Sequence, residues 1–232
     1  MNERGTDSRT GLSESVLISG LHYPVNVLGH GRRVGIWLQG CSIACPGCVS
    51  KDTWPFDERK RTTVSAVMEW VRSHAHADVD GVTISGGEPF EQPLALHALI
   101  KAIRTWFEVL RANERIAKDR DILCYSGLPW RKIRGQYEEI LLNLDAVIPE
   151  PYVANLPVCN LRGSSNQNIH CLTLLGKARY GDLKSKVCRS LQVDIDEAGG
   201  LVLIGIPEKE ALTLMENDLK GLEITLGGAS WR

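Results

Sequence analysis

The chain has 232 residues, of which 43% are hydrophobic and 24% charged, enough apolar material for a core in one large or two small domains. Its 27 lysines and arginines nearly balance its 28 aspartates and glutamates, which excludes the broad positive field of a nucleic-acid-binding protein. No apolar run is long enough to cross a membrane, and residues 1–10 are too polar for a signal peptide. We therefore expect a cytoplasmic protein with no nucleic-acid or membrane partner. In that reducing compartment, its seven cysteines indicate metal binding, catalysis or packing rather than disulfides.

The first part of the chain alternates short apolar runs with amphipathic segments. The mixed pattern of residues 15–28 predicts no regular element, whereas apolar runs predict strands at residues 34–40, 81–85, 121–126 and 146–148. Helical apolar spacing predicts helices at residues 62–77, 93–113 and 130–144. Repeated strand–helix units predict an α/β fold with a parallel sheet and right-handed crossovers.

The regular alternation of predicted strands and helices ends at Pro151. The next segment contains the sequence RGSSNQ (residues 162–167) and one possible strand at residues 169–175. Residues 191–195 and 201–206 resemble a β-hairpin, and Pro207 opens a predicted helix that reaches about residue 220. This part of the chain either forms a small appended unit or completes the sheet.

Three cysteines follow the first predicted buried strand in a CX3CX2C pattern: Cys41, Cys45 and Cys48. Their short, glycine-bearing loop lets three thiolates converge on one inorganic site. Zinc needs a fourth ligand, and the available His22 and His30 do not stand at a usual zinc-site spacing. Three thiolates suit a [4Fe–4S] cluster in which one iron remains open to a small chelating molecule. The remaining alternative is three unrelated thiols.

A second motif, Gly86-Gly87-Glu88-Pro89, ends the strand predicted at residues 81–85. Two glycines allow a ligand to approach the backbone closely, Glu88 offers an acceptor for an amino group, and Pro89 stiffens the turn. Alone, this pattern equally describes a turn that ends a strand. Beside the cysteine loop it indicates a ligand site, because the carboxyl ends of neighbouring parallel strands meet at one edge of the sheet.

The cysteine pattern and the GGEP turn together resemble the radical S-adenosylmethionine (SAM) superfamily. Residues 31–54 and the later RGSSNQ resemble its anaerobic ribonucleotide reductase activating branch, in which a glycine also precedes the last cysteine, as Gly47 does here. Two features depart from that branch: Ser50 stands where asparagine is frequent, and the chain continues well beyond Gly176.

The resemblance implies a partial, open (β/α) barrel with parallel strands over residues 29–175, preceded by an N-terminal segment, 1–28, and followed by a small extension, 176–232, with the hairpin and helix. It implies two cofactors, a [4Fe–4S] cluster and SAM. An electron from an external donor such as flavodoxin or ferredoxin cleaves SAM reductively, and the resulting 5′-deoxyadenosyl radical abstracts hydrogen from a glycine of a partner glycyl radical enzyme.

The resemblance also implies which residues hold these groups. The cluster ligands are Cys41, Cys45 and Cys48. The contacts to SAM are assigned to the GGEP turn, with two weaker candidates elsewhere: Gly86, Gly87, Glu88, Pro89, Ser126 and Asn166. No catalytic side chain is assigned beyond these residues.

Two alternatives stay open: a radical SAM enzyme that modifies a small molecule or peptide, with the extension closing its pocket, and a non-enzymatic iron–sulfur or zinc protein. Cys124, inside a predicted strand, is expected to be a buried apolar residue. Cys159, Cys171 and Cys188 are spaced too widely to predict a second cluster, although one remains possible.

Overall fold

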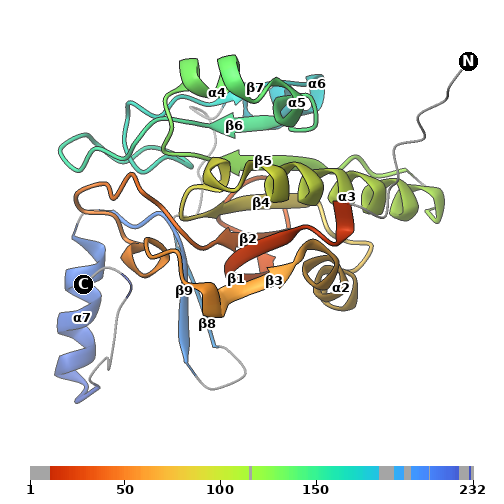
Figure 1. The fold of residues 1–232 in the computed structure, drawn as a ribbon. Helices are drawn as coiled ribbons and strands as arrows, with labels where there is room; N and C mark the ends of the chain where they lie inside the picture. The colour runs from red at the N-terminus through yellow and green to blue at the C-terminus, as the bar shows by residue number, and fades with distance from the viewer. Residues whose placement is uncertain are drawn as a thin grey trace, which may run out of the picture.

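A computed structural model describes residues 11–114, 117–182, 191–195, 200–208, 210–224 and 230. Within these ranges the main sheet has seven strands in the order β3-β1-β2-β4-β5-β6-β7 (Figure 1). Its strands are β1 (Ser15–Val25), β2 (Arg33–Leu38), β3 (Arg61–Thr63), β4 (Gly81–Gly86), β5 (Asp121–Tyr125), β6 (Ala146–Ile148) and β7 (His170–Cys171). No helix in the described part is both long and apolar enough to span a bilayer.

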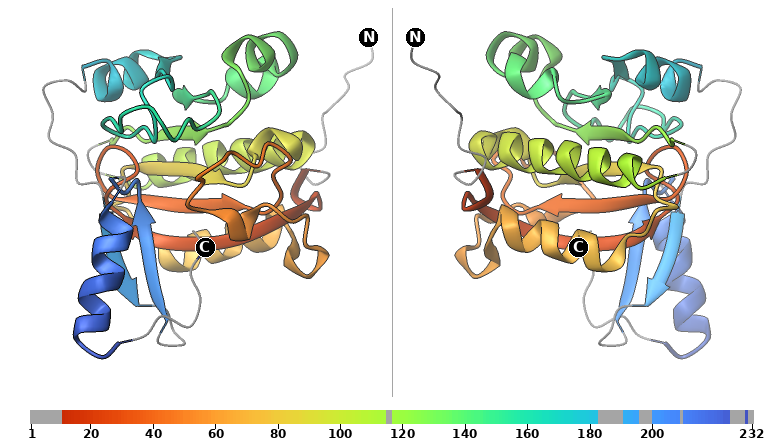
Figure 2. Two further views of the ribbon diagram at one scale, coloured as in Figure 1. Left: turned by 90° about the vertical axis from the view of Figure 1, so that its left-hand side faces the viewer. Right: turned by 90° about the vertical axis from the view of Figure 1, so that its right-hand side faces the viewer.

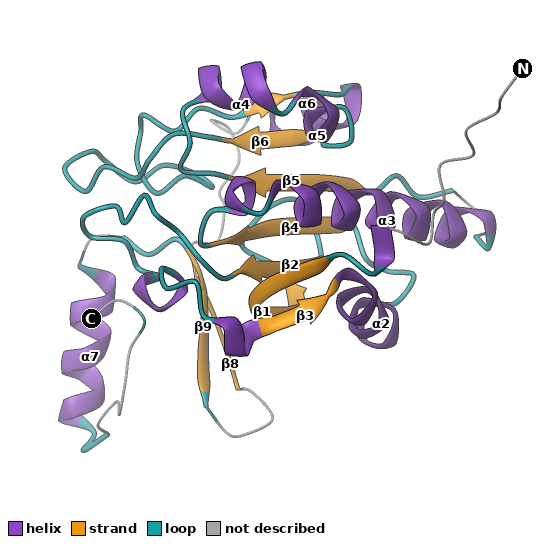
Figure 3. Cartoon of the chain, viewed as in Figure 1, coloured by secondary structure: helices purple, strands orange, loops and turns teal. Residues whose placement is uncertain are grey.

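The centre of this sheet is parallel. Strands β2, β4, β5 and β6 pair in parallel register, whereas β1, β3 and β7 pair antiparallel with their neighbours. The predicted strand–helix alternation is therefore confirmed as an α/β fold with a parallel centre. The carboxyl ends of β2, β4 and β5 point to one edge, which we call the carboxyl edge, and the longer loops gather there (Figure 3). Closure of this sheet toward a barrel stays a prediction.

Helices cover both faces of the sheet. They are α2 (Val64–His74), α3 (Pro93–Ala112), α4 (Trp130–Gln136), α5 (Glu138–Leu141) and α6 (Leu174–Tyr180), with single 3-10 turns η1 (Lys51–Thr53), η2 (Glu58–Lys60) and η3 (Pro89–Glu91). Apolar residues of α2, α3, α4 and α5 share one core with Ile122 and Cys124 of β5, whereas Tyr180 of α6 packs with Leu123 on the opposite face. The alternation along β5 assigns Cys124 to the core, as predicted.

The predicted C-terminal hairpin and helix are confirmed. Strands β8 (Leu191–Ile195) and β9 (Leu201–Gly205) form a separate antiparallel pair, and α7 (Ala211–Gly221) lies beside it at the carboxyl edge (Figures 1 and 2). Ile204 packs against residues of β1 and the loop that follows it. The Gln192 side chain fastens the hairpin there, since Nε2 donates to the Pro24 carbonyl at 2.8 Å and Oε1 accepts from the Asn26 N–H at 2.9 Å.

Three local predictions were wrong. Residues 15–25 form the strand β1, which joins the main sheet and contains two register shifts. One shift spans Pro24, which has no N–H to donate and is therefore suited to an irregular position in a strand. The single helix predicted for residues 130–144 divides at Tyr137, where the backbone leaves helical geometry and the ring packs on Phe90. The strand predicted at residues 169–175 is limited to β7, after which α6 begins.

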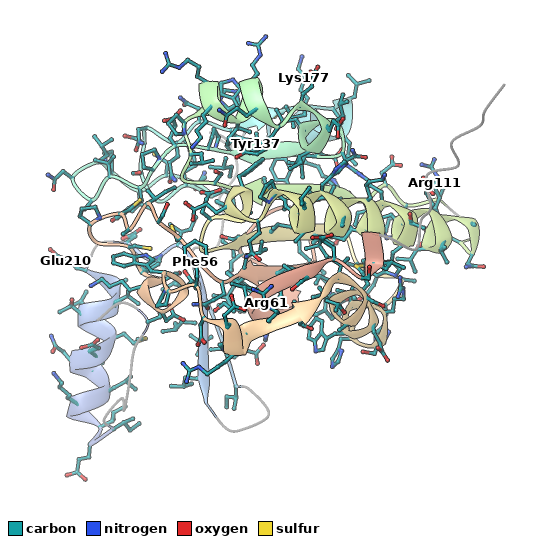
Figure 4. All side chains as sticks on the ribbon, in the orientation of Figure 1. Phe56, Arg61, Arg111, Tyr137, Lys177 and Glu210 are labelled. Atoms are coloured by element: carbon teal, nitrogen blue, oxygen red, sulfur yellow. The ribbon has the colours of Figure 1, made fainter. Side chains whose placement is uncertain are left out.

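A buried ion pair fastens the opposite edge of the sheet, where the parallel strands begin. Arg33 of β2 donates two hydrogen bonds of 2.9 Å to the Asp121 carboxylate of β5, and both side chains are fully buried. Tyr180 donates a third bond to this carboxylate at 2.6 Å. Burial alone would raise the pKa of Asp121, but the Arg33 charge and these bonds hold it below its ordinary value. Figure 4 shows the two edges at opposite sides of the molecule, with Phe56 near the carboxyl edge and Arg111 at the other side, at the end of α3.

Candidate active site at the carboxyl edge of the sheet

The cysteine loop leaves the end of β2 through Gly40. This residue has a φ of 105°, and an added Cβ would lie 2.5 Å from the Phe56 ring, so glycine is required there. The loop closes on itself because the Gly40 N–H donates to the Thr53 carbonyl at 2.7 Å and the Cys41 N–H to the Trp54 carbonyl at 2.9 Å. The three cysteines are therefore carried on a closed loop directly after a central strand.

Backbone N–H groups surround all three sulfurs. Those of Ile43 and Ala44 interact with the Cys41 sulfur, that of Tyr152 with the Cys45 sulfur, and that of Ser50 donates to the Cys48 sulfur at 3.4 Å. Burial raises the pKa of the Cys41 and Cys45 thiols, and these donors oppose the rise. All three thiols are free. N–H donors aimed at sulfur are the surroundings that a cluster-bound thiolate requires, so the residues present fit an iron–sulfur cluster.

The GGEP turn packs directly against this loop. The Gly87 N–H donates to the Leu38 carbonyl at 2.7 Å, and the Glu88 N–H to the Gly40 carbonyl at 2.8 Å. A Cβ at Gly87 would lie 2.1 Å from the Gly40 oxygen, and one at Gly86, whose φ is 108°, would lie 2.3 Å from the Leu38 backbone. Both glycines are thus needed for the turn to approach the cysteine loop. Pro89 is buried at the first position of η3 and does not reach the cavity described below.

Glu88 is a fully buried carboxylate, and no lysine, arginine or histidine among the described residues forms an ion pair with it. Oε1 accepts from the Phe90 N–H at 3.0 Å and the Ser126 hydroxyl at 2.8 Å, and Oε2 accepts from the Gly127 N–H at 2.6 Å. Burial raises its pKa to about 7 although these hydrogen bonds oppose the rise. A carboxylate has about four acceptor sites, so roughly one site on Glu88 is left for a ligand amino group.

One cavity of about 250 Å³ joins these parts. Most of the predicted site residues line it: Cys41, Cys45, Cys48, Gly86, Gly87, Glu88 and Ser126. Asn166 does not line it; its Nδ2 donates to the Pro151 carbonyl at 2.9 Å, and its Oδ1 is buried without a partner.

The sequence interpretation missed much of the cavity wall. Aromatic residues from several elements and apolar residues from the extension line it: Trp37, Trp54, Tyr125, Tyr152, Leu191, Leu203, Ile204, Ile206, Pro207 and Leu212. Gly127, directly after a predicted strand, had a usable local signal. The small-molecule alternative expected the extension to close the pocket, but no local signal singled out these hairpin residues, because only tertiary packing brings them to this edge.

Other candidate ligands lie elsewhere. His22 bonds to Asp194 at 3.0 Å, and neither it nor His30 lines the cavity. Cys188 lies outside the described residues. Within the described ranges, no group of three His, Cys, Asp or Glu side chains can hold a single metal ion. A [4Fe–4S] cluster makes a different demand, because each thiolate binds a different iron and the sulfurs stand further apart.

The fold and this site define an α/β protein with a cysteine-lined ligand cavity. The family model described as a 4Fe-4S single cluster domain matches residues 27–170, well over half of the chain. The chain therefore belongs to this iron–sulfur family.

Several similar proteins are named as activating proteins or activating enzymes. The anaerobic ribonucleoside-triphosphate reductase-activating protein of Salmonella typhi is 27% identical over 163 residues, which cover 65% of this chain and 96% of the relative. Its counterpart from Haemophilus influenzae is 29% identical over 156 residues, covering 64% and 94%. The pyruvate formate-lyase-activating enzyme of Clostridium pasteurianum is 25% identical over 162 residues, covering 68% of this chain and 58% of the relative.

These comparisons confirm the predicted resemblance. The chain is an enzyme of the radical SAM superfamily, similar to the activating proteins, and its cofactors are a [4Fe–4S] cluster and SAM. The non-enzymatic alternative was wrong. Which residues hold the two cofactors stays a proposal.

Proposed function

We propose that this enzyme generates an organic radical and passes it to a glycine of a partner glycyl radical enzyme. Cys41, Cys45 and Cys48 would hold the cluster, and the backbone of Gly86 and Gly87 with the Glu88 carboxylate would hold the methionine end of SAM. When bound, these cofactors supply one-electron cleavage of the SAM sulfonium and a 5′-deoxyadenosyl radical that abstracts hydrogen. The observation that carries the proposal is the single cavity lined by the cysteine loop, the GGE turn and Ser126.

The surrounding residues orient the ligand and exclude water. Glu88 is held by three hydrogen bonds, so it does not need to reorganise when an amino group binds. Ser126 donates to Glu88 and accepts from the Leu128 N–H at 3.0 Å, which makes it a support for the carboxylate. The aromatic and aliphatic wall keeps the cavity apolar, as a reactive radical requires.

The charge of the cavity bears on the substrate. Among the described residues that line it, Glu88 is the only one with a formally charged side chain, and none is an arginine or lysine. A phosphorylated metabolite would find no cationic partner among them. An uncharged peptide segment around a glycine suits this lining, and the names of the reductase-activating relatives agree with a protein substrate.

One observation favours a second candidate, a radical SAM enzyme that modifies a small molecule or a peptide. The hairpin, the segment after it and α7 contribute part of the cavity wall, including Ile204, Pro207 and Leu212. A wall of this kind restricts access and suits a substrate that enters as a short segment.

Anaerobic reconstitution with iron and sulfide, reduction and addition of SAM test the chemistry. We expect 5′-deoxyadenosine from the wild type and none from Cys45→Ala, with Cys124→Ala as a matched control because Cys124 is buried outside the cavity. Absence of the product from the wild type would refute both candidates.

Deuterium labelling separates the two. Transfer from a labelled glycine of a candidate partner enzyme into 5′-deoxyadenosine supports the activating function, and transfer only from a small molecule or free peptide supports the second candidate. The donor is proposed to be a small one-electron carrier such as flavodoxin or ferredoxin, acting in the cytoplasm.

A further inference from the structure

The segment Glu150 to Val153 follows β6 and brings Tyr152 to the cysteine loop. The Tyr152 N–H interacts with the Cys45 sulfur, and the side chain lines the cavity. The ring lies between two glycines: a Cβ added at Gly47 would lie 3.5 Å from Tyr152 Cε1, and one at Gly163 would lie 3.1 Å from Cδ2. The Tyr152 ring therefore packs on the loop at Gly47, between Cys45 and Cys48.

The late motif RGSSNQ fixes this segment on both sides of Tyr152. Gln167 Nε2 donates to the Glu150 carbonyl at 2.9 Å, and Asn166 Nδ2 donates to the Pro151 carbonyl at 2.9 Å. The Val153 N–H donates to the Ser164 hydroxyl at 3.1 Å. Ser164 is fully buried and Gln167 is 9% exposed, so water competes little for these bonds.

The backbone at Glu150 shows how firmly the segment is held. Its φ of 85° is unusual for a residue with a side chain and persists only where the surrounding structure imposes it. The Glu150 N–H donates to the Leu128 carbonyl at 3.0 Å, and its carboxylate accepts from the Trp130 N–H at 2.9 Å. With the Gln167 bond, three contacts thus hold this one residue immediately before the Pro151–Tyr152 step.

We propose that Tyr152 is a positioning residue for the iron–sulfur centre, and that residues 162–167 are the clamp that places it. Its ring covers the loop between Cys45 and Cys48 from the cavity side. This inference rests on the proposed cluster ligands. Hydrogen bonds to sulfur and exposure to solvent both set the reduction potential of an iron–sulfur centre. Removing the ring admits water, which stabilises the extra negative charge of the reduced state and therefore raises the potential.

The test is a redox titration of the reconstituted protein followed by electron paramagnetic resonance, with iron retention after anaerobic dilution as a second readout. We expect Tyr152→Ala to raise the midpoint potential and to weaken iron retention about tenfold, the lower range for residues that support metal ligands. Tyr152→Phe keeps the ring and is expected to restore both values. Tyr23→Ala is the matched control, because Tyr23 is a partly buried tyrosine that does not line the cavity and hydrogen-bonds Asp78.

Gln167→Ala provides an independent test that leaves the Tyr152 ring in place. It removes one clamp bond and is expected to shift the potential in the same direction as Tyr152→Ala, so the inference remains testable if Tyr152→Ala does not fold. An unchanged potential and iron retention in the folded variants would overturn the inference, as would a Tyr152→Phe protein that behaves like Tyr152→Ala. A wild type that binds no cluster would instead refute the proposed cluster ligands.

Discussion

Replacing Glu88 with glutamine should remove the pH dependence that this residue gives to folding stability and should weaken SAM binding. Glu88 is fully buried, and burial raises its pKa from 4.5 to about 7. The folded chain therefore binds this proton more tightly than the unfolded chain. The contribution of Glu88 to the free energy of unfolding is greatest below pH 4.5. It declines as the pH rises and is lost once the pH exceeds about 7. A rise of the pKa from 4.5 to about 7 corresponds to about 3 kcal/mol of folding free energy.

Glutamine fills the same volume without the charge. Its amide nitrogen faces N–H donors that the carboxylate accepted, which costs about 1–2 kcal/mol at every pH. The pH-dependent part disappears, so the stability of Glu88→Gln relative to the wild type should rise by roughly 2–3 kcal/mol between pH 5 and pH 8. Denaturant unfolding of the cluster-free proteins at a series of pH values measures this, with exposed Glu108→Gln as the control.

The same variant should bind SAM more weakly after cluster reconstitution. A hydrogen bond to a charged group contributes about 1.5–3 kcal/mol, so the loss should be about tenfold or more by isothermal titration calorimetry. A stability difference that does not change with pH, or changes in favour of the wild type, would refute the burial argument. Unchanged SAM affinity would refute the assignment of Glu88 to the amino group.

Four further substitutions test other parts of the structure. Cys45→Ala should remove the visible absorption of the reconstituted cluster, because two thiolates remain. Gly87→Ala should destabilise by about 2 kcal/mol or more in denaturant unfolding, since its Cβ would lie 2.1 Å from the Gly40 oxygen. Gly135→Ala meets nothing within 4 Å in α4 and should instead stabilise by about 0.5–1 kcal/mol in the same assay. Asp121→Asn breaks a buried ion pair and should lower the free energy of unfolding by about 3–5 kcal/mol without removing cluster absorption.

Local sequence signals were sufficient for the central part of the fold. The apolar runs that became β2, β4, β5 and β6 are continuous because these strands are buried on both faces. The cysteine loop and the GGEP turn follow neighbouring strands, and parallel pairing alone brings them to one edge. Strand β1 was missed because Gly20 and Pro24 interrupt the pattern of its side chains. Its strand conformation depends on pairing with β2, which the local sequence does not reveal.

The position of Asn166 in the fold could not be predicted from its local sequence, and its contact with SAM stays a prediction. An asparagine after RGSS is equally compatible with a ligand contact and with a turn. The partner of its side chain, the Pro151 carbonyl, lies 15 residues earlier on a different segment, so the local sequence does not indicate this contact. Tyr152 carried no signal for the same reason. Its proximity to Cys45 and Gly47 crosses more than 100 residues of chain and depends on β6 lying three strands from β2 in the sheet, with β4 and β5 between them.

The extension contributes part of the cavity wall, whereas the proposed cofactor ligands lie earlier in the chain. The family match ends at residue 170, and every residue named for the cluster and for SAM lies before that point. Leu191, Leu203 and Leu212 lie after it and supply only apolar surface to the cavity. Ser230 is also beyond the match, and it fastens the end of the chain to the cysteine loop: its hydroxyl donates to the Val49 carbonyl at 2.8 Å. We therefore propose that these surfaces, which the family match does not include, influence which substrate enters, so that substrate choice in this enzyme differs from that of relatives with the same cofactors.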